Sequence, residues 1–291
     1  MKKRHIAILM YQTDNINTVQ RYLINQFVQL WREDGHDVFY LFGINRFVPA
    51  DLIIVHIDLT EVPESYLDFA SQYPVAVNGK ISNIKKSTFS QNLLRPNDSW
   101  DGQVIVKTDR NAAGVPERWR GGYLKKIQNK LLSVFDIDHS DLHLFSPRIK
   151  SQYDYPIYEH ISKVPRHYFY HPGLIVQKFI PERENEYYCL RYMSFLGDRI
   201  TCSRLKGKFQ IVTGGTAEVV EHPIEPHPKI IEMRKKLHFD YGKFDYVVVD
   251  GEAILLDANK TVGSSPNLVD NREMMQRRKY RAEGLYSYFD V

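Results

Sequence analysis

The chain has 291 residues, of which 43% are apolar and 25% are charged, as in a folded globular protein with room for two or three subdomains. The formal net charge is only +4, which gives little support to nucleic-acid binding, because that function needs a concentrated basic face. No apolar run approaches the ~20 residues of a membrane-spanning helix. We therefore expect neither a nucleic-acid partner nor a membrane partner.

The N-terminal sequence MKKRHIAILM is basic and then apolar, but the apolar run is short and the polar residues 12–14 follow it. This pattern predicts a first strand and not a signal peptide. The two cysteines, Cys189 and Cys202, have neither zinc-binding nor redox spacing. Both fall in predicted strands, so we expect small buried side chains in a reducing, cytoplasmic protein.

Residues 1–80 predict alternating strands and helices, which is the pattern of a small parallel α/β domain. The apolar run at residues 51–57 is continuous, as expected for a strand buried on both faces. No G-x-G-x-x-G follows the first strand, so a dinucleotide site is disfavoured. The predicted strands are 5–11, 37–42, 51–57 and 75–77, and the predicted helices are 17–34 and 63–73.

The middle of the chain begins with a predicted helix over residues 81–94, which carries Lys85 and Lys86. Residues 96–102 have turn chemistry and mark a candidate boundary. A strand over residues 103–108 contains Lys107 and leads into a small, polar loop. A lysine beside a loop of exposed N–H groups is one way to hold phosphates, although a surface hairpin has the same pattern. Further on, we expect a helix over 123–134 and strands over 155–161 and 167–170.

Residues 173–206 predict three strands, at 174–179, 186–195 and 199–205, with a hairpin signal between the last two. We expect the hairpin to continue over residues 206–212, up to Gly214-Gly215. Helices are predicted over 228–238 and 268–281. The second carries Arg277, Arg278 and Lys279, which we expect to form a solvated face.

Residues 244–266 read FDYVVVDGEAILLDANKTVGSSP and carry the strongest pattern in the chain. Asp250-Gly251 predicts a hairpin between two apolar runs. Side chains alternate along a strand, so Asp257 and Asn259 lie on the same side, and pairing across the turn brings Asp245 beside them. Hard oxygen ligands of this kind suit Mg²⁺ bound to substrate phosphates. Solvated strand ends are the alternative.

The order of these features resembles the ATP-grasp superfamily, which includes D-alanine–D-alanine ligase, glutathione synthetase and ribosomal-protein glutamate ligases. The resemblance is strongest over residues 174–266, looser back to Lys85, and covers residues 1–80 only as the α/β domain that precedes the nucleotide-binding part. It implies a mixed α/β and α+β protein with the ATP-grasp fold. The implied domains are an N-terminal α/β domain (1–95), a central subdomain (96–176) and a C-terminal subdomain with the metal site (177–291).

The resemblance also implies residues that bind the nucleotide. Lys107 would contact its phosphates, together with either Lys86 or Lys85, and residues 109–114 would cover them, although this loop has one glycine where the family has more. Glu184 would bind the ribose hydroxyls, with Glu186 as its rival. The backbone of a hinge would bind adenine, chiefly through the Ile180 amide and the Lys178 carbonyl. That hinge consists of Gln177, Lys178, Phe179 and Ile180.

By the same resemblance, Asp245, Asp257 and Asn259 would hold Mg²⁺, with an aspartate at 257 where glutamate is commoner. Arg204 would face the γ-phosphate or an acyl-phosphate. The alternative is that Arg204 is a surface residue of a hairpin. Residues 262–265, Val-Gly-Ser-Ser, would contact the acceptor substrate.

The implied activity is that of an ATP- and Mg²⁺-dependent carboxylate–amine or carboxylate–thiol ligase. The carboxylate would be activated as an acyl-phosphate and then joined to the nucleophile. The partners would be ATP and small-molecule or peptide carboxylates and amines; because such proteins are often dimers, a homodimer is one expectation. Alternatives are a kinase acting on a hydroxyl, a non-catalytic ATP-binding regulatory module, and a sugar-nucleotide transferase with its ligand near residues 11–15. The sequence carries no substrate motif.

Overall fold

The computed structural model describes residues 2–120, 149–264 and 272–289. The chain divides into two compact units, one formed by Met1–Asn83 with Arg183–Val291 and the other by Ile84–Glu182. The N-terminal and C-terminal parts of the chain thus belong to one unit. The boundaries expected at residues 95 and 176 stay predictions.

The N-terminal part of the first unit is a parallel α/β sheet, as expected, with the strand order β2-β1-β3-β4. Its helices are α1, α2 and α3. The helix predicted over residues 17–34 is interrupted, because Tyr22 pairs with Gly263 and the Leu23 amide donates to the Val262 carbonyl at 2.8 Å. The elements are β1 (His5–Met10), α1 (Ile16–Val19), α2 (Leu23–Glu33), β2 (Asp37–Phe42), β3 (Leu52–Val55), α3 (Glu64–Ala70) and β4 (Ala76–Val77).

The C-terminal part of the first unit is an antiparallel sheet with the order β11-β10-β9-β12-β13, in which β8 also pairs with β9. The prediction that the hairpin continues over residues 210–212 is wrong: β10 ends at Gly207, and a turn closed by Thr213 and Thr216 leads to β11. The elements are β8 (Glu182–Glu184), β9 (Tyr187–Leu196), β10 (Arg199–Gly207), β11 (Val219–Glu221), α7 (Pro228–Lys236), β12 (Tyr241–Val249), β13 (Glu252–Asn259), α8 (Arg272–Ala282) and η6 (Glu283–Tyr288).

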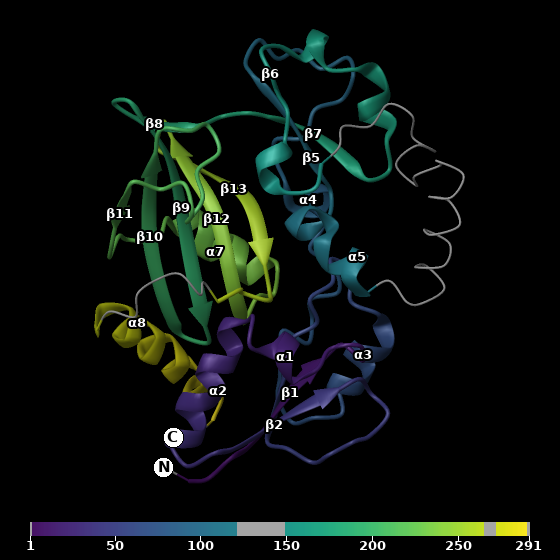
Figure 1. Ribbon diagram of the computed structural model, residues 1–291, viewed down its shortest axis with the longest axis vertical. Coiled ribbons are helices and arrows are strands. Elements are labelled where there is room, and N and C mark those ends of the chain that lie inside the picture. Colours follow the sequence, from purple (N-terminus) through teal and green to yellow (C-terminus); the bar gives the residue numbers. More distant parts are fainter. Residues whose placement is uncertain (1, 121–148, 265–271, 290–291) are drawn as a thin grey trace. The chain divides into compact units, whose positions relative to one another are not determined.

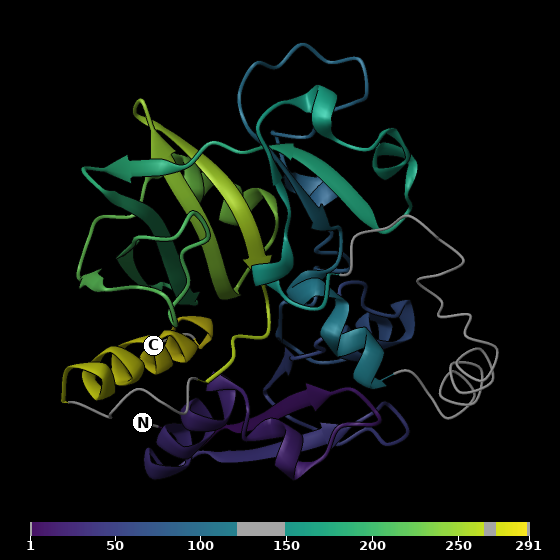
Figure 2. The same ribbon diagram turned by 45° about the horizontal axis from the view of Figure 1, so that its top comes forward.

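One hydrophobic core joins the two sheets of the first unit. It contains Phe27 and Trp31 of α2 together with Leu196, Tyr241 and Leu285 from the C-terminal part. Helix α8 lies alongside α2 (Figures 1 and 2), and the Trp31 indole donates to the Ala282 carbonyl at 2.8 Å. The apolar face that the sequence predicts for α2 is therefore buried against residues far away in the chain.

Asn78 forms a second link between the two parts of the first unit. Its side chain is buried, and its Oδ1 accepts hydrogen bonds from the amides of Asp240 and Tyr241, each at 3.0 Å. Its Nδ2 donates to the Tyr241 carbonyl at 2.8 Å, and its own amide donates to Asp240 Oδ2 at 2.8 Å. These bonds fix the chain just after β4 to the start of β12.

The second unit contains a small antiparallel sheet with the order β6-β5-β7. Most of the helix predicted over residues 81–94 is absent, because this segment pairs beside β7: Leu94 donates to Val176 and Lys178 donates to Asn92, each through its amide. The strand predicted at 167–170 is a 3-10 helix, and the helix predicted at 123–134 lies outside the described residues. The elements are α4 (Lys86–Phe89), β5 (Val104–Thr108), η1 (Asn111–Gly114), α5 (Val115–Arg120), η3 (Gln152–Asp154), β6 (Ile157–Tyr158), η4 (Ile161–Lys163), η5 (Arg166–Tyr170) and β7 (Leu174–Lys178).

Both cysteines are buried and have free thiols, as expected, and the Cys202 sulfur lies 3.1 Å from the Tyr246 hydroxyl. Across residues 2–120, 149–264 and 272–289, the structure contains no helix long and apolar enough to cross a membrane.

Candidate active site

The β12–β13 hairpin brings the predicted acidic residues together. Asp250 and Gly251 form its turn with positive φ angles of 52° and 79°, and Asp245 lies directly opposite Asp257 in the strand register. The register shifts between Asp245 and Tyr246, so that Leu256 is an extra residue in β13. Such a bulge bends the strand and redirects the side chains next to it. The predicted convergence of Asp245 and Asp257 is therefore confirmed.

The antiparallel register extends this arrangement across neighbouring strands, because directly opposite residues point to the same face of a sheet. The face that carries the two aspartates also carries hydroxyl groups and one lysine, Lys243. Two adjacent rows cross this face. One consists of Ser203, Tyr192, Asp245 and Asp257, and the other of Thr201, Ser194, Lys243 and Asn259.

Lys243 is a site residue that the sequence analysis missed. Its Nζ lies 2.9 Å from Asp245 Oδ2, and its side chain is 31% exposed. Burial acts to lower the pKa of Lys243, but the carboxylates of Asp245 and Asp257 outweigh it and raise the pKa, so the side chain is an ammonium. Its position in the sequence could have identified it, because a residue two positions before Asp245 in a strand lies on the same face as Asp245.

Asn259 is held at the end of β13 by the residues that follow it. Its Oδ1 accepts a hydrogen bond from the amide of Thr261 at 2.8 Å, and the Thr261 hydroxyl oxygen lies 3.2 Å from it. The same hydroxyl donates to Asp58 Oδ1 at 2.7 Å, and the buried Lys260 ammonium donates to the Leu59 carbonyl. The position of Asn259 is thus set by contacts with the N-terminal part of the unit.

The donor set of this face fits Mg²⁺. Two opposed carboxylates and a nearby amide oxygen are hard ligands, and Mg²⁺ usually takes one or two carboxylates and completes its shell with water and substrate phosphates. Within the described part of the chain, no cluster of three or more His, Cys, Asp or Glu side chains has metal-binding geometry. A cation at Asp245 and Asp257 would therefore depend on Asn259, water and substrate for its remaining ligands.

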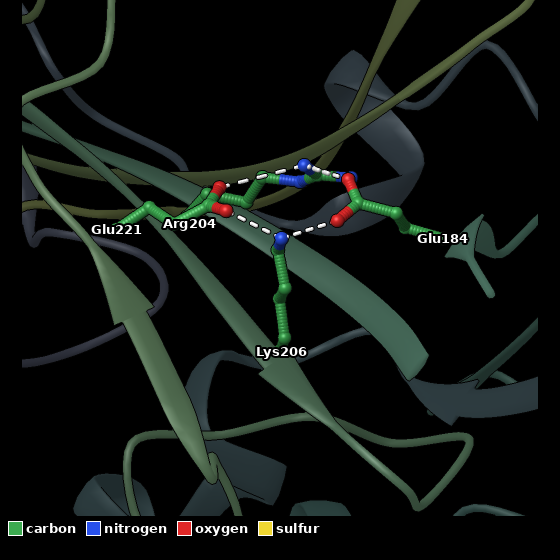
Figure 3. A network of polar contacts seen from close by, with 4 residues as sticks. All are labelled: Glu184, Arg204, Lys206 and Glu221. Atoms are coloured by element: carbon green, nitrogen blue, oxygen red, sulfur yellow. Dashed lines mark hydrogen bonds and ion pairs between the residues drawn. The ribbon is translucent and has the colours of Figure 1, made fainter. Parts of the chain in front are cut away.

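Glu184 is clamped between two cations (Figure 3). Arg204 Nη1 lies 2.5 Å from one of its carboxylate oxygens, and Lys206 Nζ contacts the other. Glu221 on β11 also contacts both cations, with Arg204 Nη1 at 3.4 Å from its Oε2. Lys206 first and Arg204 second lower the pKa of Glu184, and hydrogen bonds to Glu184 and Glu221 raise the pKa of Lys206.

The two candidate residues for ribose binding differ in their contacts. Glu184 is fixed in orientation, whereas Glu186 is exposed in the turn between β8 and β9. Arg204 pairs in register with Arg191, which in turn pairs with Tyr246, so it lies on the opposite face of the sheet from Asp245. The structure therefore does not bring Arg204 to the aspartates, and its contact with a γ-phosphate stays a prediction.

The second unit contains the predicted lysines. Lys86 is buried in α4, and its Nζ donates to the Arg110 carbonyl at 3.0 Å, inside the predicted phosphate loop. Lys85 is the residue just before α4 and is half-buried. Lys107 is half-buried near the end of β5, as predicted. A hydrogen bond therefore links Lys86 to this loop.

The predicted phosphate loop is ordered by Asp109, which accepts hydrogen bonds from the Ser87 amide at 2.8 Å and the Ser87 hydroxyl at 2.7 Å. Ala112 and Ala113 have left-handed φ angles of 45° and 55°, and Gly114 follows with 73°. Alanine disfavours this conformation, which glycine adopts readily. The loop thus has a backbone suited to glycine although it contains only one.

The predicted hinge begins in the last two residues of β7 and continues past its end. The Gln177 amide group donates to the Ser90 hydroxyl at 2.6 Å. The backbone amide of Lys178 donates to Asn92 and that of Phe179 donates to Gln103, each at 2.8 Å. The resemblance implies that the Ile180 amide and the Lys178 carbonyl bind adenine. Neither group takes part in these two backbone hydrogen bonds. The Lys178 ammonium lies 4.7 Å from the centre of the Trp100 ring.

No protein-family model matches the chain, and no curated protein matches it. Among solved structures, it is similar to D-alanine–D-alanine ligase from Bacillus anthracis, with a TM-score of 0.50 at 10% identity over 98% of this chain and 96% of that chain. It also matches a RimK domain ATP-grasp protein from Sphaerobacter thermophilus (TM-score 0.48, 11% identity, 98% of each chain). A third match is macrocyclase MdnC from Microcystis aeruginosa (TM-score 0.47, 12% identity, 96% of this chain and 98% of that chain). The likeness to the D-alanine–D-alanine ligase, together with the sheets described above, shows that this chain has the ATP-grasp fold.

Proposed function

We propose that the protein is an ATP-dependent ligase that joins a carboxylate to an amine. The observation that carries this proposal is the direct opposition of Asp245 and Asp257 on a face that also holds Asn259 and Lys243, in a chain with the ATP-grasp fold. Lys243 balances one of the two opposed carboxylates, and the other costs free energy unless a further cation balances it. A magnesium-loaded triphosphate supplies that cation and gives the arrangement a use.

In this proposal, Asp245, Asp257 and Asn259 of the first unit hold Mg²⁺, which offsets the negative charge of the phosphates. Lys243 adds a positive charge beside Asp245. Glu184 or Glu186 binds the ribose hydroxyls. The Glu184 carboxylate contacts Arg204 and Lys206 on the sheet face opposite Asp245, so these contacts leave the choice between the two glutamates open. The same face separates Arg204 from a γ-phosphate held by the aspartates.

The second unit supplies the other nucleotide groups in this proposal. Lys107 and Lys86 bind phosphate oxygens, with Lys85 as the alternative to Lys86. The Lys178 carbonyl and the Ile180 amide bind the adenine edge. The hydrogen bonds that fix Gln177, Lys178 and Phe179 within the unit support this role, because they hold the hinge backbone in one conformation.

The proposed reaction has two steps. An oxygen of the substrate carboxylate attacks the γ-phosphorus of ATP, the bond from that phosphorus to the β–γ bridging oxygen breaks, and ADP leaves. The amine nitrogen then attacks the carbonyl carbon of the acyl-phosphate, inorganic phosphate leaves, and the nitrogen loses a proton to solvent. The protein contributes orientation and charge neutralisation, as in phosphoryl transfer generally.

The test is phosphate release from MgATP with the full chain, in the presence of paired amino acids, short peptides and small carboxylates. We expect one combination to stimulate release of ADP and phosphate and to yield an amide product, identified by mass spectrometry. A phosphorylated hydroxyl as the product would instead establish the kinase alternative. Nucleotide binding without stimulated release by any combination would establish the non-catalytic module.

A further inference from the structure

A cavity of about 180 Å³ in the first unit lies between α2, α8 and the strands β9, β10 and β12. Lys243 and three arginines of α8 line it, and none of the described residues that line it carries a carboxylate. Hydroxyl groups line it from the sheet side. The cations are Lys243, Arg277, Arg278 and Arg281, and the hydroxyl residues of the strands are Tyr192, Ser194, Thr201 and Ser203.

The arginines lie on the face of α8 that is turned inward. Met274, Arg277, Arg278 and Arg281 recur at helical spacing and are half-buried, whereas Lys279 is exposed. A helix face that packs on a sheet is ordinarily apolar. Partly burying three guanidinium groups there costs desolvation free energy, which a bound anion would offset. The prediction of a solvated face is confirmed for Lys279, whereas Arg277 and Arg278 are half-buried and line the cavity.

The charged side chains in and around the cavity determine its net charge. Arg277 pairs with Glu273 on the same helix, and Arg281 Nε donates to the Arg277 carbonyl at 3.3 Å. Burial first, and then the charge of Arg277, lower the pKa of His222, so this ring is neutral at pH 7; its Nδ1 lies 2.8 Å from the Ser203 hydroxyl. Among the described residues, Glu273 contacts Arg277 and Asp245 contacts Lys243, and neither carboxylate lines the cavity.

The cavity also adjoins the proposed metal site through Lys243. The ammonium of this residue lines the cavity and at the same time lies 2.9 Å from Asp245 Oδ2. Ser194 pairs in register with Lys243, and Tyr192 pairs with Asp245, so the floor of the cavity and the aspartates belong to one sheet face. A ligand in the cavity would therefore have a cation at both ends, one beside the aspartates and the others on α8.

We propose that this cavity binds the carboxylate substrate of the ligase and that this substrate carries a second anionic group, either a carboxylate or a phosphate. Val262, Gly263 and Ser264, which the resemblance implies for the acceptor substrate, also line the cavity, so this assignment replaces that one. The reacting carboxylate lies near Lys243, and the second anionic group binds the arginines of α8. The cavity volume of about 180 Å³ is several times the ~30 Å³ that one water molecule occupies in the liquid, so the cavity has room for a small dianion. The reaction assigned to this ligand rests on the proposed ligase function, but its binding does not.

The test compares binding of succinate and butyrate to the full chain by calorimetry without nucleotide, because these acids share a four-carbon skeleton and differ by one carboxylate. Phosphoglycolate and glycolate form a second pair that distinguishes a phosphate from a carboxylate as the second group. In at least one pair, we expect the dianion to bind tenfold or more tightly than its partner. Arg278→Met should remove this preference, whereas Lys279→Met, on the exposed face of the same helix, should change it less than twofold.

Equal binding of both members of each pair by the wild-type protein overturns the cavity proposal, and this comparison needs no variant. Equal loss of the preference in Arg278→Met and Lys279→Met also overturns it. Tight binding of a dianion without phosphate release from MgATP by any carboxylate overturns the ligase function and leaves the dianion site standing. Binding of MgATP by Arg278→Met, expected to be unchanged, confirms that this variant is folded.

Discussion

Asp257 lies opposite Asp245 only because β13 contains one extra residue, Leu256. Regular pairing from the two-residue turn would place Leu256 opposite Asp245 and Asp257 opposite Phe244. Since neighbouring residues of a strand point to opposite faces, Asp257 would then lie on the other face of the sheet. The bulge therefore decides whether the two carboxylates can share one cation.

Replacing Asp257 with asparagine should abolish ligase turnover, because the substitution keeps the shape of the side chain and removes its charge. We expect a loss of at least 100-fold in kcat, with thermal unfolding close to that of the wild type. Asp257→Glu should retain part of the activity, because a longer carboxylate still ligates the metal. Phosphate release at several Mg²⁺ concentrations measures both variants. Normal turnover of Asp257→Asn would show that the metal assignment is wrong.

Replacing Lys243 with methionine should make folding more dependent on Mg²⁺. The ammonium pairs with Asp245. Its loss leaves two opposed carboxylates without this cation, which we expect to cost about 1–3 kcal/mol. Mg²⁺ should recover more stability in this variant than in the wild type, because it replaces the missing charge. Thermal unfolding with and without Mg²⁺ measures this difference. An identical response to Mg²⁺ in both proteins would contradict it.

Replacing Asn78 with alanine should destabilise the first unit by about 3 kcal/mol. The side chain forms three hydrogen bonds to residues at the start of β12, and each is worth about 1 kcal/mol net. Its positive φ of 60° adds to the cost, because alanine disfavours this conformation. Urea unfolding measures the change. Asn97→Ala, at an exposed position, is the control and should change stability by less than about 0.5 kcal/mol.

Replacing Ala112 with glycine should stabilise the second unit by about 0.5–1 kcal/mol. Ala112 is exposed and has a left-handed backbone, so glycine relieves strain without loss of packing; the greater freedom of glycine in the unfolded chain offsets part of this gain. Ala113→Gly should gain less, because the Ala113 methyl is buried. Urea unfolding ranks the two variants. Lower stability of Ala112→Gly than of the wild type would contradict the left-handed conformation.

The clamp on Glu184 should produce a pH-dependent contribution to stability. Lys206 and Arg204 lower the pKa of Glu184 from its ordinary value of 4.5. A carboxyl group with a lowered pKa stabilises the folded state at pH values above 4.5, and this contribution is lost as the pH falls through the lowered pKa. The difference in melting temperature between the wild type and Glu184→Gln should therefore be largest near pH 6–7 and shrink below pH 4.5. A difference that is constant with pH would contradict the clamp.

The local pattern of the sequence predicted much of the fold. The alternation of apolar runs and helical stripes predicted the parallel sheet of the N-terminal part, and Asp250-Gly251 predicted the hairpin that carries Asp245 and Asp257. The errors fall where distant segments pair. Residues 81–94 lie beside β7 and do not continue a helix, and the helix over residues 17–34 is interrupted where Tyr22 meets Gly263.

By itself, the sequence determined the kinds of chemical group available and the strands that carry them, because turn residues and hydrophobic periodicity act over a few neighbouring positions. Only the tertiary structure decided the face on which each group lies. The bulge at Leu256, the pairing of Lys243 with Asp245, the contacts of Glu184 with two cations, and the inward orientation of the arginines of α8 all depend on register and packing between distant segments. A shift of one residue in register moves a side chain to the other face of a sheet, and no local pattern in the sequence specifies that shift.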